Sequence, residues 1–520
     1  MSRIIDTVKK TIKNFFELQS GKIAALVISS ITGFFAQLYF YSNELIFSYR
    51  DAVTHLDSAR RFFDSITPGV LSQMGTVWLP IPHFLLLPLT YIDYFWFTGL
   101  AGCILGYFCY IITCLNVFRL GELITEKGLT KWVTFSIFAF NPNILYFQTT
   151  AMTEPVFYMF LLTSLFFLLR WQDYKKKFDL IASGFFAALA MGTRYEAWLF
   201  TFFIAVFIFI IYKRRKRNPL RGLFLFYSIP VFFIFLWLLY NWIYFNDPLD
   251  FQRGEYSSQA LMKPFEEAGN LPAKGNIFVA IEIYFKAVFS NISVFFFILS
   301  LVGVYIYYRR FKFFNKSLIP YVTITVFIVG ISSLFLGQVA VLLPNTEPAG
   351  YFNARYGLFA FPFIIYFVGY LYDRISIKKI YEVVGLIVVV IISILWVFNY
   401  PYSAGSIEEA YYFDSYHPEL KRASVFLKNN YNGKRILYDD KNLNLYPYCQ
   451  IPIKERIHKH TFKFGEVALK SPSLVVGWIM VDNRINDEVL FYIKDLPDFK
   501  ANFKIVYVDR GIEIYKRIRD

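Results

Sequence analysis

Long apolar stretches alternate with short polar breaks along the first 400 residues, and beyond residue 400 the apolar runs become shorter. Many of the long stretches approach the roughly 20 residues that an α-helix needs to cross a bilayer. We therefore expect an all-α polytopic membrane domain over residues 1–400. The eleven predicted spans are 22–42, 99–118, 132–148, 154–170, 179–193, 197–212, 223–245, 288–308, 318–342, 358–372 and 381–400.

Composition supports an integral membrane protein. The chain is 56% hydrophobic and only 18% charged, whereas soluble domains are about 25% charged. The first 22 residues are basic and amphipathic, unlike a cleaved secretory leader, which ends in a small-residue cleavage site. We expect this segment to remain part of the protein.

Basic residues lie mainly in the short loops on one side of the predicted membrane, including the run "KRRKRNPLR" at 213–221. The positive-inside rule then places the N-terminus inside and the C-terminal region outside. Topology accounts for most of the net charge of +15, so nucleic acid is not an expected partner. The four cysteines indicate no disulfide framework.

The C-terminal region, residues 401–520, carries strand-like runs at 435–440, 473–481, 503–509 and 511–517, with a helical pattern at 484–496. The last two runs meet at Arg510 and Gly511, which predicts a tight hairpin. We expect a small extracytoplasmic α/β domain here. It contains no glycine-rich phosphate loop.

The long polar segments of the membrane domain fall mostly on the predicted outer side, and the longest is residues 43–98. It contains the sequence "SYRDAVTHLDSARR" at 48–61. Helical spacing from residue 48 to 64 predicts an apolar stripe made of Ala52, Leu56, Ala59 and Phe63. Another face, at spacings that allow internal ion pairs, carries Asp57, Arg60, Arg61 and Asp64. The piece at 82–98 has the character of an interfacial or re-entrant segment.

Asp51 and His55 share a third face of this predicted helix, one turn apart. A structural role is open for both: Ser48 and Asp51 have the spacing of a capping box. His55 and His83 would equally serve as hydrogen-bonded residues at the membrane surface, near Trp78. No third ligand has convincing spacing for a metal site.

Charged residues also stand at three other outer boundaries of predicted spans. Each has an ordinary alternative, such as a helix cap, a snorkelling anchor or a local ion pair. Four charged clusters converging on one face of a bundle instead favour a functional site, because ionisable groups at membrane boundaries are costly. The residues concerned are Glu154, Arg194, Glu196, Arg355 and Tyr356.

The order of these motifs resembles the C-type (GT-C) membrane glycosyltransferases, which take sugar from a polyprenyl-phosphate carrier. The matching strings are "YRDAVTHLDSARR", "GTVWLPIPHFLLLP", "TEP", "RYEAW" and "NARYGLFAFP". The first two are most similar to a bacterial and archaeal branch described as protein-O-mannosyltransferase-like. The resemblance covers roughly residues 20–400 and implies a prokaryotic plasma-membrane enzyme with an outward-facing active site.

This resemblance implies a role for each candidate. Asp51 corresponds to the catalytic base, which takes the proton of an acceptor hydroxyl as it attacks the anomeric carbon with inversion. Glu154 is implied to be the second acidic residue of the site. Arginines are expected to hold the leaving phosphate. The expected substrate- and phosphate-binding residues are His55, Arg60, Arg61, His83, Arg194, Glu196, Arg355 and Tyr356.

The resemblance also bears on cofactors and partners. Related dolichyl-type enzymes often carry two adjacent acidic residues in the first loop, but Ala52 follows Asp51 here. We therefore expect no metal cofactor, with a divalent ion still open. The expected partners are membrane lipid, a lipid-linked sugar as donor substrate, and a protein, lipid or glycan acceptor.

Two other function classes compete with the transferase. A transporter or lipid flippase would also be polytopic, but it would place charges near the midplane and often show inverted repeats. A membrane scaffold or receptor would use residues 401–520 as its binding module. The charges of this chain stand at the outer boundary and no internal repeat is visible, which argues against a transporter. The long first loop with Asp51 argues against a scaffold.

Overall fold

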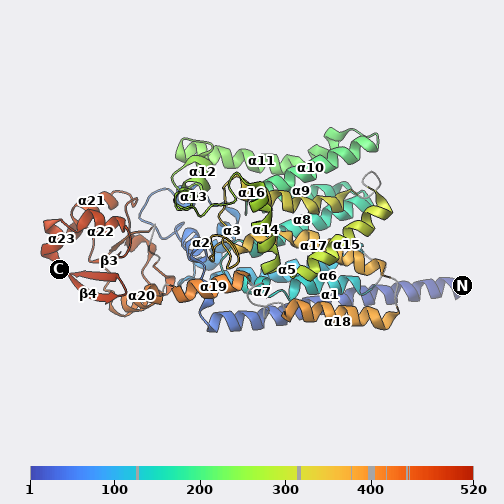
Figure 1. Cartoon of the computed structure of the whole chain (residues 1–520), viewed down its shortest axis with the longest axis horizontal. Helices are drawn as coiled ribbons and strands as arrows, with labels where there is room; N and C mark the ends of the chain where they lie inside the picture. Colours follow the sequence, from blue (N-terminus) through green and yellow to red (C-terminus); the bar gives the residue numbers. More distant parts are fainter. Residues whose placement is uncertain are drawn as a thin grey trace.

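The chain forms an elongated molecule in the computed structural model, with a helical bundle and a smaller region that contains the β-strands at one end (Figure 1). The N-terminus of helix α1 (Ser2–Ser42) projects from the opposite end. The structure describes residues 2–124, 128–312, 318–375, 378–395, 405–416, 418–440, 443 and 445–518.

Within these described residues, seven helical segments are long and apolar enough to cross a membrane, so the protein is an integral membrane protein. The two most buried segments lie at α8 and at η4 with α17, whereas outer helices expose apolar side chains, as contact with lipid requires. The seven are residues 20–42 of α1, α5 (Leu100–Ile124), α8 (Glu154–Tyr174), α10 (Glu196–Arg214), α11 (Pro219–Phe245), α15 (Val294–Phe311), and η4 (Ala354–Ala360) continued by α17 (Phe361–Arg374).

The remaining predicted spans are shorter or interrupted. The span expected at 132–148 divides into α6 (Thr130–Ala139) and α7 (Pro142–Phe147), because Asn141 accepts N–H bonds at the start of α7 and Pro142 begins it. The span expected at 318–342 is η3 (Ile319–Ile324) followed by α16 (Thr325–Phe335). The last residues of the predicted span 381–400 lie outside the described residues. The other two of these spans form α9 (Lys177–Met191) and α18 (Lys379–Leu395).

Residues 246–287, which lie between two of the predicted spans, are largely helical. They contain α12 (Asp250–Arg253), α13 (Ser258–Glu267) and most of α14 (Ile277–Asn291). Asn276 caps α14 by accepting the N–H groups of Phe278 and Val279. Eleven crossings and an inside N-terminus stay predictions.

The first long loop folds as a series of short helices: η1 (Leu45–Phe47), α2 (Arg50–Arg60), η2 (Leu71–Met74), α3 (Ile81–Thr90) and α4 (Asp93–Phe97). Two details expected for α2 are wrong. Tyr49, not Ser48, precedes the helix and its side chain makes no capping bond, so there is no capping box. Ala52, Leu56 and Ala59 are buried, but Phe63 lies beyond the helix end and is 42% exposed.

The C-terminal region begins with α19 (Gly405–Tyr416) and α20 (Pro418–Asn430), followed by a five-stranded mixed sheet of order β2-β1-β3-β5-β4. The predicted hairpin joins β4 and β5, with Arg510 and Gly511 both at positive φ. The two-residue strand β2 was not predicted. The strands are β1 (Ile436–Tyr438), β2 (Arg456–Ile457), β3 (Trp478–Asp482), β4 (Phe503–Asp509) and β5 (Ile512–Arg517); the short helices are η6 (Pro447–Cys449), η7 (Ile453–Glu455), α21 (Gly465–Lys470), η8 (Pro472–Leu474), α22 (Glu488–Ile493) and α23 (Pro497–Asn502).

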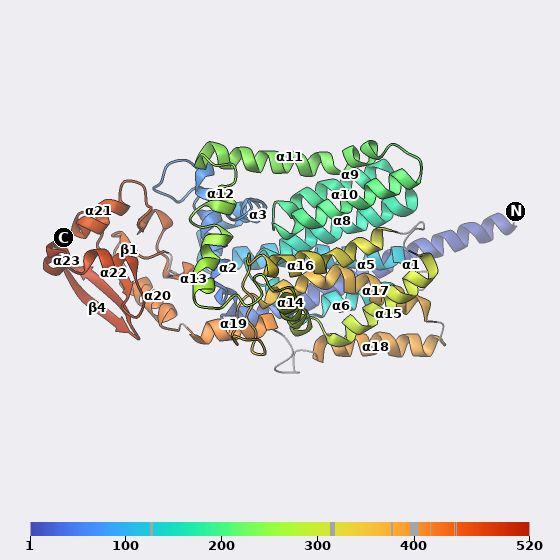
Figure 2. The ribbon, with the colours of Figure 1, turned by 45° about the horizontal axis from the view of Figure 1, so that its top comes forward.

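Helix α19 joins the two parts of the molecule. It lies between the strand region and the bundle in both views (Figures 1 and 2) and contacts α7, α14 and η4. One hydrophobic cluster also runs from the bundle into this region. The predicted domain boundary at residue 400 falls among residues 396–404, outside the described residues, and stays a prediction.

Candidate functional site

Four segments far apart in sequence bring charged side chains together at the end of the bundle beside the C-terminal region. Asp51 comes from the first turn of α2, and Glu154 from the first turn of α8. Arg194 lies in the turn between α9 and α10, Glu196 begins α10, and Arg355 lies in η4. These four predicted clusters therefore do converge.

Acidic and basic groups alternate through the site. Arg355 Nη2 lies 2.7 Å from Asp51 Oδ2, and its Nε lies 3.5 Å from Glu154 Oε1. Arg194 Nη1 contacts the same Glu154 oxygen at 2.5 Å, and its Nη2 lies 2.7 Å from Glu196 Oε1. Three carboxylates and two guanidinium groups thus form one continuous chain of charges.

The two ends of the Asp51–Arg355–Glu154 series differ in exposure. The Glu154 side chain is only 3% exposed and that of Arg355 is 11% exposed, whereas 41% of the Asp51 side chain is accessible. The dense surroundings of Asp51 disfavour its charged form, but Arg355 outweighs them and lowers the pKa of Asp51 below its usual value. Asp51 is therefore an accessible carboxylate.

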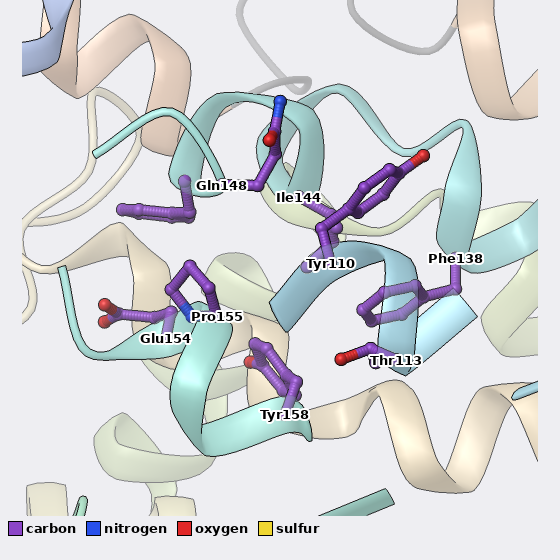
Figure 3. Close-up of a pocket in the computed structure, with 9 residues that line it drawn as sticks. Tyr110, Thr113, Phe138, Ile144, Gln148, Glu154, Pro155 and Tyr158 are labelled. Carbon is purple, nitrogen blue, oxygen red and sulfur yellow. The ribbon is translucent and has the colours of Figure 1, made fainter. Parts of the chain in front are cut away.

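Glu154 lies at the centre of the charge chain. Its Oε1 contacts both arginines, while Oε2 and the Nε of Arg355 have no hydrogen-bond partner among the described residues. Its carboxylate points away from the small cavity lined by Tyr110, Phe138 and Tyr158 (Figure 3). Glu154 is itself one of the residues that line this cavity, so the cavity adjoins the charged site.

Aromatic rings support both guanidinium groups. The Arg355 guanidinium lies 5.4 Å from the ring of Tyr49, the residue that precedes α2. Arg194 lies 5.1 Å from the ring of Tyr356. Cation–π contacts of this kind help to fix a cation in place, and they add to the ion pairs that both arginines make with carboxylates.

His55 and His83 form a separate buried pair. His55 Nδ1 and His83 Nε2 are 2.9 Å apart, and the His55 ring packs 4.2 Å from that of Trp78. His83 is fully buried in the protein. Burial lowers the pKa of His55 to about 4, despite Asp51 nearby. A neutral His55 therefore packs beside Asp51.

Arg60 and Arg61 lie outside the charge chain. With about 1.5 Å of rise per residue, they are roughly 14 Å along α2 from Asp51. Arg60 contacts Asp64 at 3.2 Å and Asp93 at 2.5 Å, and donates to the carbonyl of Thr90. Its donors are committed to the fold.

Sequence reasoning missed the contribution of the C-terminal region. Glu409 of α19 accepts the backbone N–H groups of Asn353 and Ala354, next to Arg355. Arg456 of β2 lies 2.9 Å from Asp57 of α2. The partners are 55 and 399 residues apart, so no local pattern could have revealed them.

Within the part of the chain that the structure describes, no group of three or more His, Cys, Asp or Glu side chains is arranged to hold a metal ion. Asp51 and Glu154 instead share Arg355 between them.

Neither a protein-family model nor a curated protein matches the sequence. Solved structures do match the fold. The crystal structure of ArnT from Cupriavidus metallidurans bound to undecaprenyl phosphate is 11% identical, with a TM-score of 0.50, and the match covers 91% of this chain and 98% of that one.

Two crystal structures of the Archaeoglobus fulgidus oligosaccharyltransferase are also similar, one with Zn and sulfate and one tethered to an acceptor peptide. Each is 10% identical, with TM-scores of 0.45 and 0.46, covering 95% and 96% of this chain and 73% and 74% of the other. At such identities a match concerns the fold alone. This chain shares the fold of ArnT over nearly its whole length, in agreement with the GT-C fold that the sequence motifs implied.

Proposed function

We propose that this protein is a membrane glycosyltransferase that moves one sugar from a polyprenyl-phosphate carrier to a hydroxyl acceptor, with Asp51 as the general base. The observation that carries the proposal is the pairing of an accessible Asp51 with Arg355 at one end of a bundle of membrane helices. The similarity to ArnT, whose structure holds undecaprenyl phosphate, supports a carrier of this chemical class.

The donor phosphate binds the arginines of the site. Arg355 is the first candidate because its Nε has no hydrogen-bond partner among the described residues and its Nη2 already holds a carboxylate. Arg194, held by Glu154 and Glu196, is the second. Guanidinium groups bind phosphate oxygens through paired charge-assisted hydrogen bonds.

Donor binding also activates the base. Arg355 stabilises the Asp51 carboxylate and lowers its pKa, which weakens it as a proton acceptor. A phosphate that takes over the Arg355 donors removes part of this stabilisation. Asp51 then becomes a stronger base only when the donor is in place.

Transfer proceeds by one displacement. The acceptor oxygen forms a bond to the anomeric carbon while its proton passes to Asp51. The bond between that carbon and the phosphate oxygen breaks, and the polyprenyl phosphate leaves with the electron pair. Attack opposite the leaving group inverts the anomeric centre, and Arg355 stabilises the added charge.

The proposal includes the side of the membrane that carries the site, the sugar that is transferred and the acceptor. The basic inner loops support a site and a C-terminal region, residues 401–520, on the outer face of the membrane. The motif resemblance supports a prokaryotic plasma membrane. The motif resemblance favours a hexose, with mannose as the first candidate. A protein hydroxyl, a lipid or a glycan can each supply the acceptor.

Binding of the carrier tests the proposal directly. The purified protein in nanodiscs is titrated with undecaprenyl phosphate, and Arg355→Gln is compared with Arg422→Gln, an exposed arginine of the C-terminal region. Loss of two charged hydrogen bonds, each worth about 1.5–3 kcal/mol, predicts at least about 100-fold weaker binding for Arg355→Gln and no change for the control. Equal binding by both variants, or no sugar transfer from any polyprenyl-phosphate donor, would contradict the proposal.

A further inference from the structure

The loop that carries Arg355 is held by a buried carboxylate from another part of the chain. Glu409 Oε1 accepts the N–H of Asn353 at 2.7 Å, and Oε2 accepts the N–H of Ala354 at 2.9 Å. The Glu409 side chain belongs to α19 and is 1% exposed. Both carboxylate oxygens therefore bind the two peptides immediately before Arg355.

This backbone needs such support because its conformation is unusual. Asn353 has a φ of 57°, in the left-handed region, immediately before η4. Its side chain also donates to the carbonyl of Ala340 at 3.1 Å. A non-glycine residue at positive φ is maintained only when its surroundings determine it.

The opposite side of the same loop is fixed as well. Asn291 Nδ2 donates to the carbonyl of Ala354 at 2.7 Å, and its Oδ1 accepts the hydroxyl of Ser406 at 2.6 Å. Ser406 belongs to α19, like Glu409. Helix α19 therefore holds the peptides at 353 and 354 both directly and through Asn291.

Helix α19 also contacts the segment that carries Asp51. Tyr49 donates its hydroxyl to the carbonyl of Ser406 at 3.1 Å, and its ring lies beneath the Arg355 guanidinium. The one helix thus touches both chain segments whose side chains form the Asp51–Arg355 pair. Errors in its position would shift both partners.

We infer that Glu409 is a positioning residue that holds the Arg355 loop so that Arg355 reaches Asp51 and Glu154. It does not touch substrate, because it is buried behind the loop. Burial raises the pKa of Glu409 to about 7, in spite of Arg355 and the two N–H donors. The inference deepens the proposed transferase function by giving the first helix of the C-terminal region a role in donor binding.

The test compares Glu409→Gln with Glu408→Gln. The amide of glutamine offers one acceptor oxygen, so its NH2 group opposes one of the two backbone N–H donors. Glu408 is the adjacent residue in the same helix, is half-buried, and likewise has a raised pKa of about 7 caused by burial. The two substitutions therefore change charge equally.

Hydrogen–deuterium exchange gives the first measurement, and it requires no enzymatic activity. We expect the amides of residues 353–355 to exchange at least tenfold faster in Glu409→Gln and at the wild-type rate in Glu408→Gln. Unchanged exchange in Glu409→Gln would overturn the inference. If Glu409→Gln does not yield folded protein, Glu409→Asp replaces it, because a shorter carboxylate retains the charge but weakens both contacts.

Donor kinetics give the second measurement. We expect Glu409→Gln to raise the KM for the polyprenyl-phosphate sugar about tenfold, with a smaller effect on the acceptor KM, since Arg355 binds the donor. Faster exchange in Glu409→Gln, together with no transferase activity in the wild-type protein, would leave the positioning role intact and reject the transferase. Faster exchange with unchanged donor KM in an active enzyme would reject the role in donor binding.

Discussion

Two faces of helix α2 carry the same kinds of side chain but different surroundings. On one face Asp51 is 41% accessible and contacts a single arginine of the bundle. On the other, Asp57 is 13% exposed and contacts the buried Arg456, while also accepting the indole N–H of Trp96. Asp64, after the helix end, accepts the N–H groups of Ile453 and Lys454.

This difference teaches that the partners, not the residue type, decide the role of a carboxylate here. Asp57 and Asp64 are fixed by groups that belong to the fold, so they attach α2 to the C-terminal region. Asp51 keeps a large accessible surface and pairs with a cation that an anionic substrate would compete for. A reactive carboxylate needs such an accessible surface and a partner that a substrate can displace.

The sharpest test of this comparison measures sugar transfer and Tm in two single variants, Asp51→Asn and Asp57→Asn. A general base contributes about 10²- to 10⁴-fold to rate, so Asp51→Asn should lower kcat for sugar transfer by that range with little change in Tm. Asp57→Asn should keep kcat within a few-fold per folded molecule. Transfer rates from a polyprenyl-phosphate sugar, together with thermal unfolding, measure both effects.

The opposite pattern would break the comparison. If Asp57→Asn abolished transfer while the protein stayed folded, the second face would take part in the chemistry. If Asp51→Asn transferred sugar at the wild-type rate, Asp51 would not be the base.

For stability we expect the reverse: Asp57→Asn should lower the Tm more than Asp51→Asn does. Asp57→Asn leaves Arg456 charged inside the protein, where its side chain is 2% exposed. Removing one partner of a buried ion pair costs about 3–5 kcal/mol, so the Tm should fall clearly. Arg456→Met combined with Asp57→Asn should recover much of the loss, because no unpaired charge remains. A double variant as unstable as Asp57→Asn would contradict this account.

Sequence reasoning succeeded where chemistry and local pattern coincide. The acidic residue after the first span, the "TEP" and "RYEAW" boundaries and the "NARYG" motif identified Asp51, Glu154, Arg194 and Arg355, which the structure brings together. Strand patterns likewise located β4 and β5 and their hairpin. These features depend on neighbours within a few residues.

The failures depend on contacts across the fold. Ser48 has capping-box spacing, but it ends the preceding helix η1 and has helical backbone angles. The residue that precedes α2 is instead Tyr49, whose side chain is buried. Glu409 and Arg456 carry no local motif, and only the docking of the C-terminal region brings Glu409 to the Arg355 loop and Arg456 to α2. The interrupted span at 132–148 was a missed local signal, since Asn141 and Pro142 are a typical helix start.

On the face of α2 that carries Asp51, His55 should make the stability of the protein depend on pH. The folded protein keeps His55 neutral down to about pH 4, whereas an unfolded histidine binds a proton below about pH 6.5. Stability is therefore lost as the pH falls from 6.5 to 4, by up to about 3 kcal/mol. His55→Asn, which retains a polar atom near the position of Nδ1, should show a smaller decline. Thermal unfolding across this pH range measures it, and parallel curves would contradict the assignment.

The smallest change in Tm should come from the exposed ion pair between Arg60 of α2 and Asp93 of α4. Asp93 pairs with Arg60 at 2.5 Å, but its side chain is 65% exposed, and such ion pairs contribute about 0.2–1 kcal/mol. Asp93→Asn should therefore shift the Tm by no more than a few degrees. Asp64→Asn should cost more, because that 6% exposed carboxylate binds Arg60 and two backbone N–H groups. If both variants had the same Tm, contacts with the C-terminal backbone would add nothing, and the attachment of α2 would depend on Asp57 and Arg456.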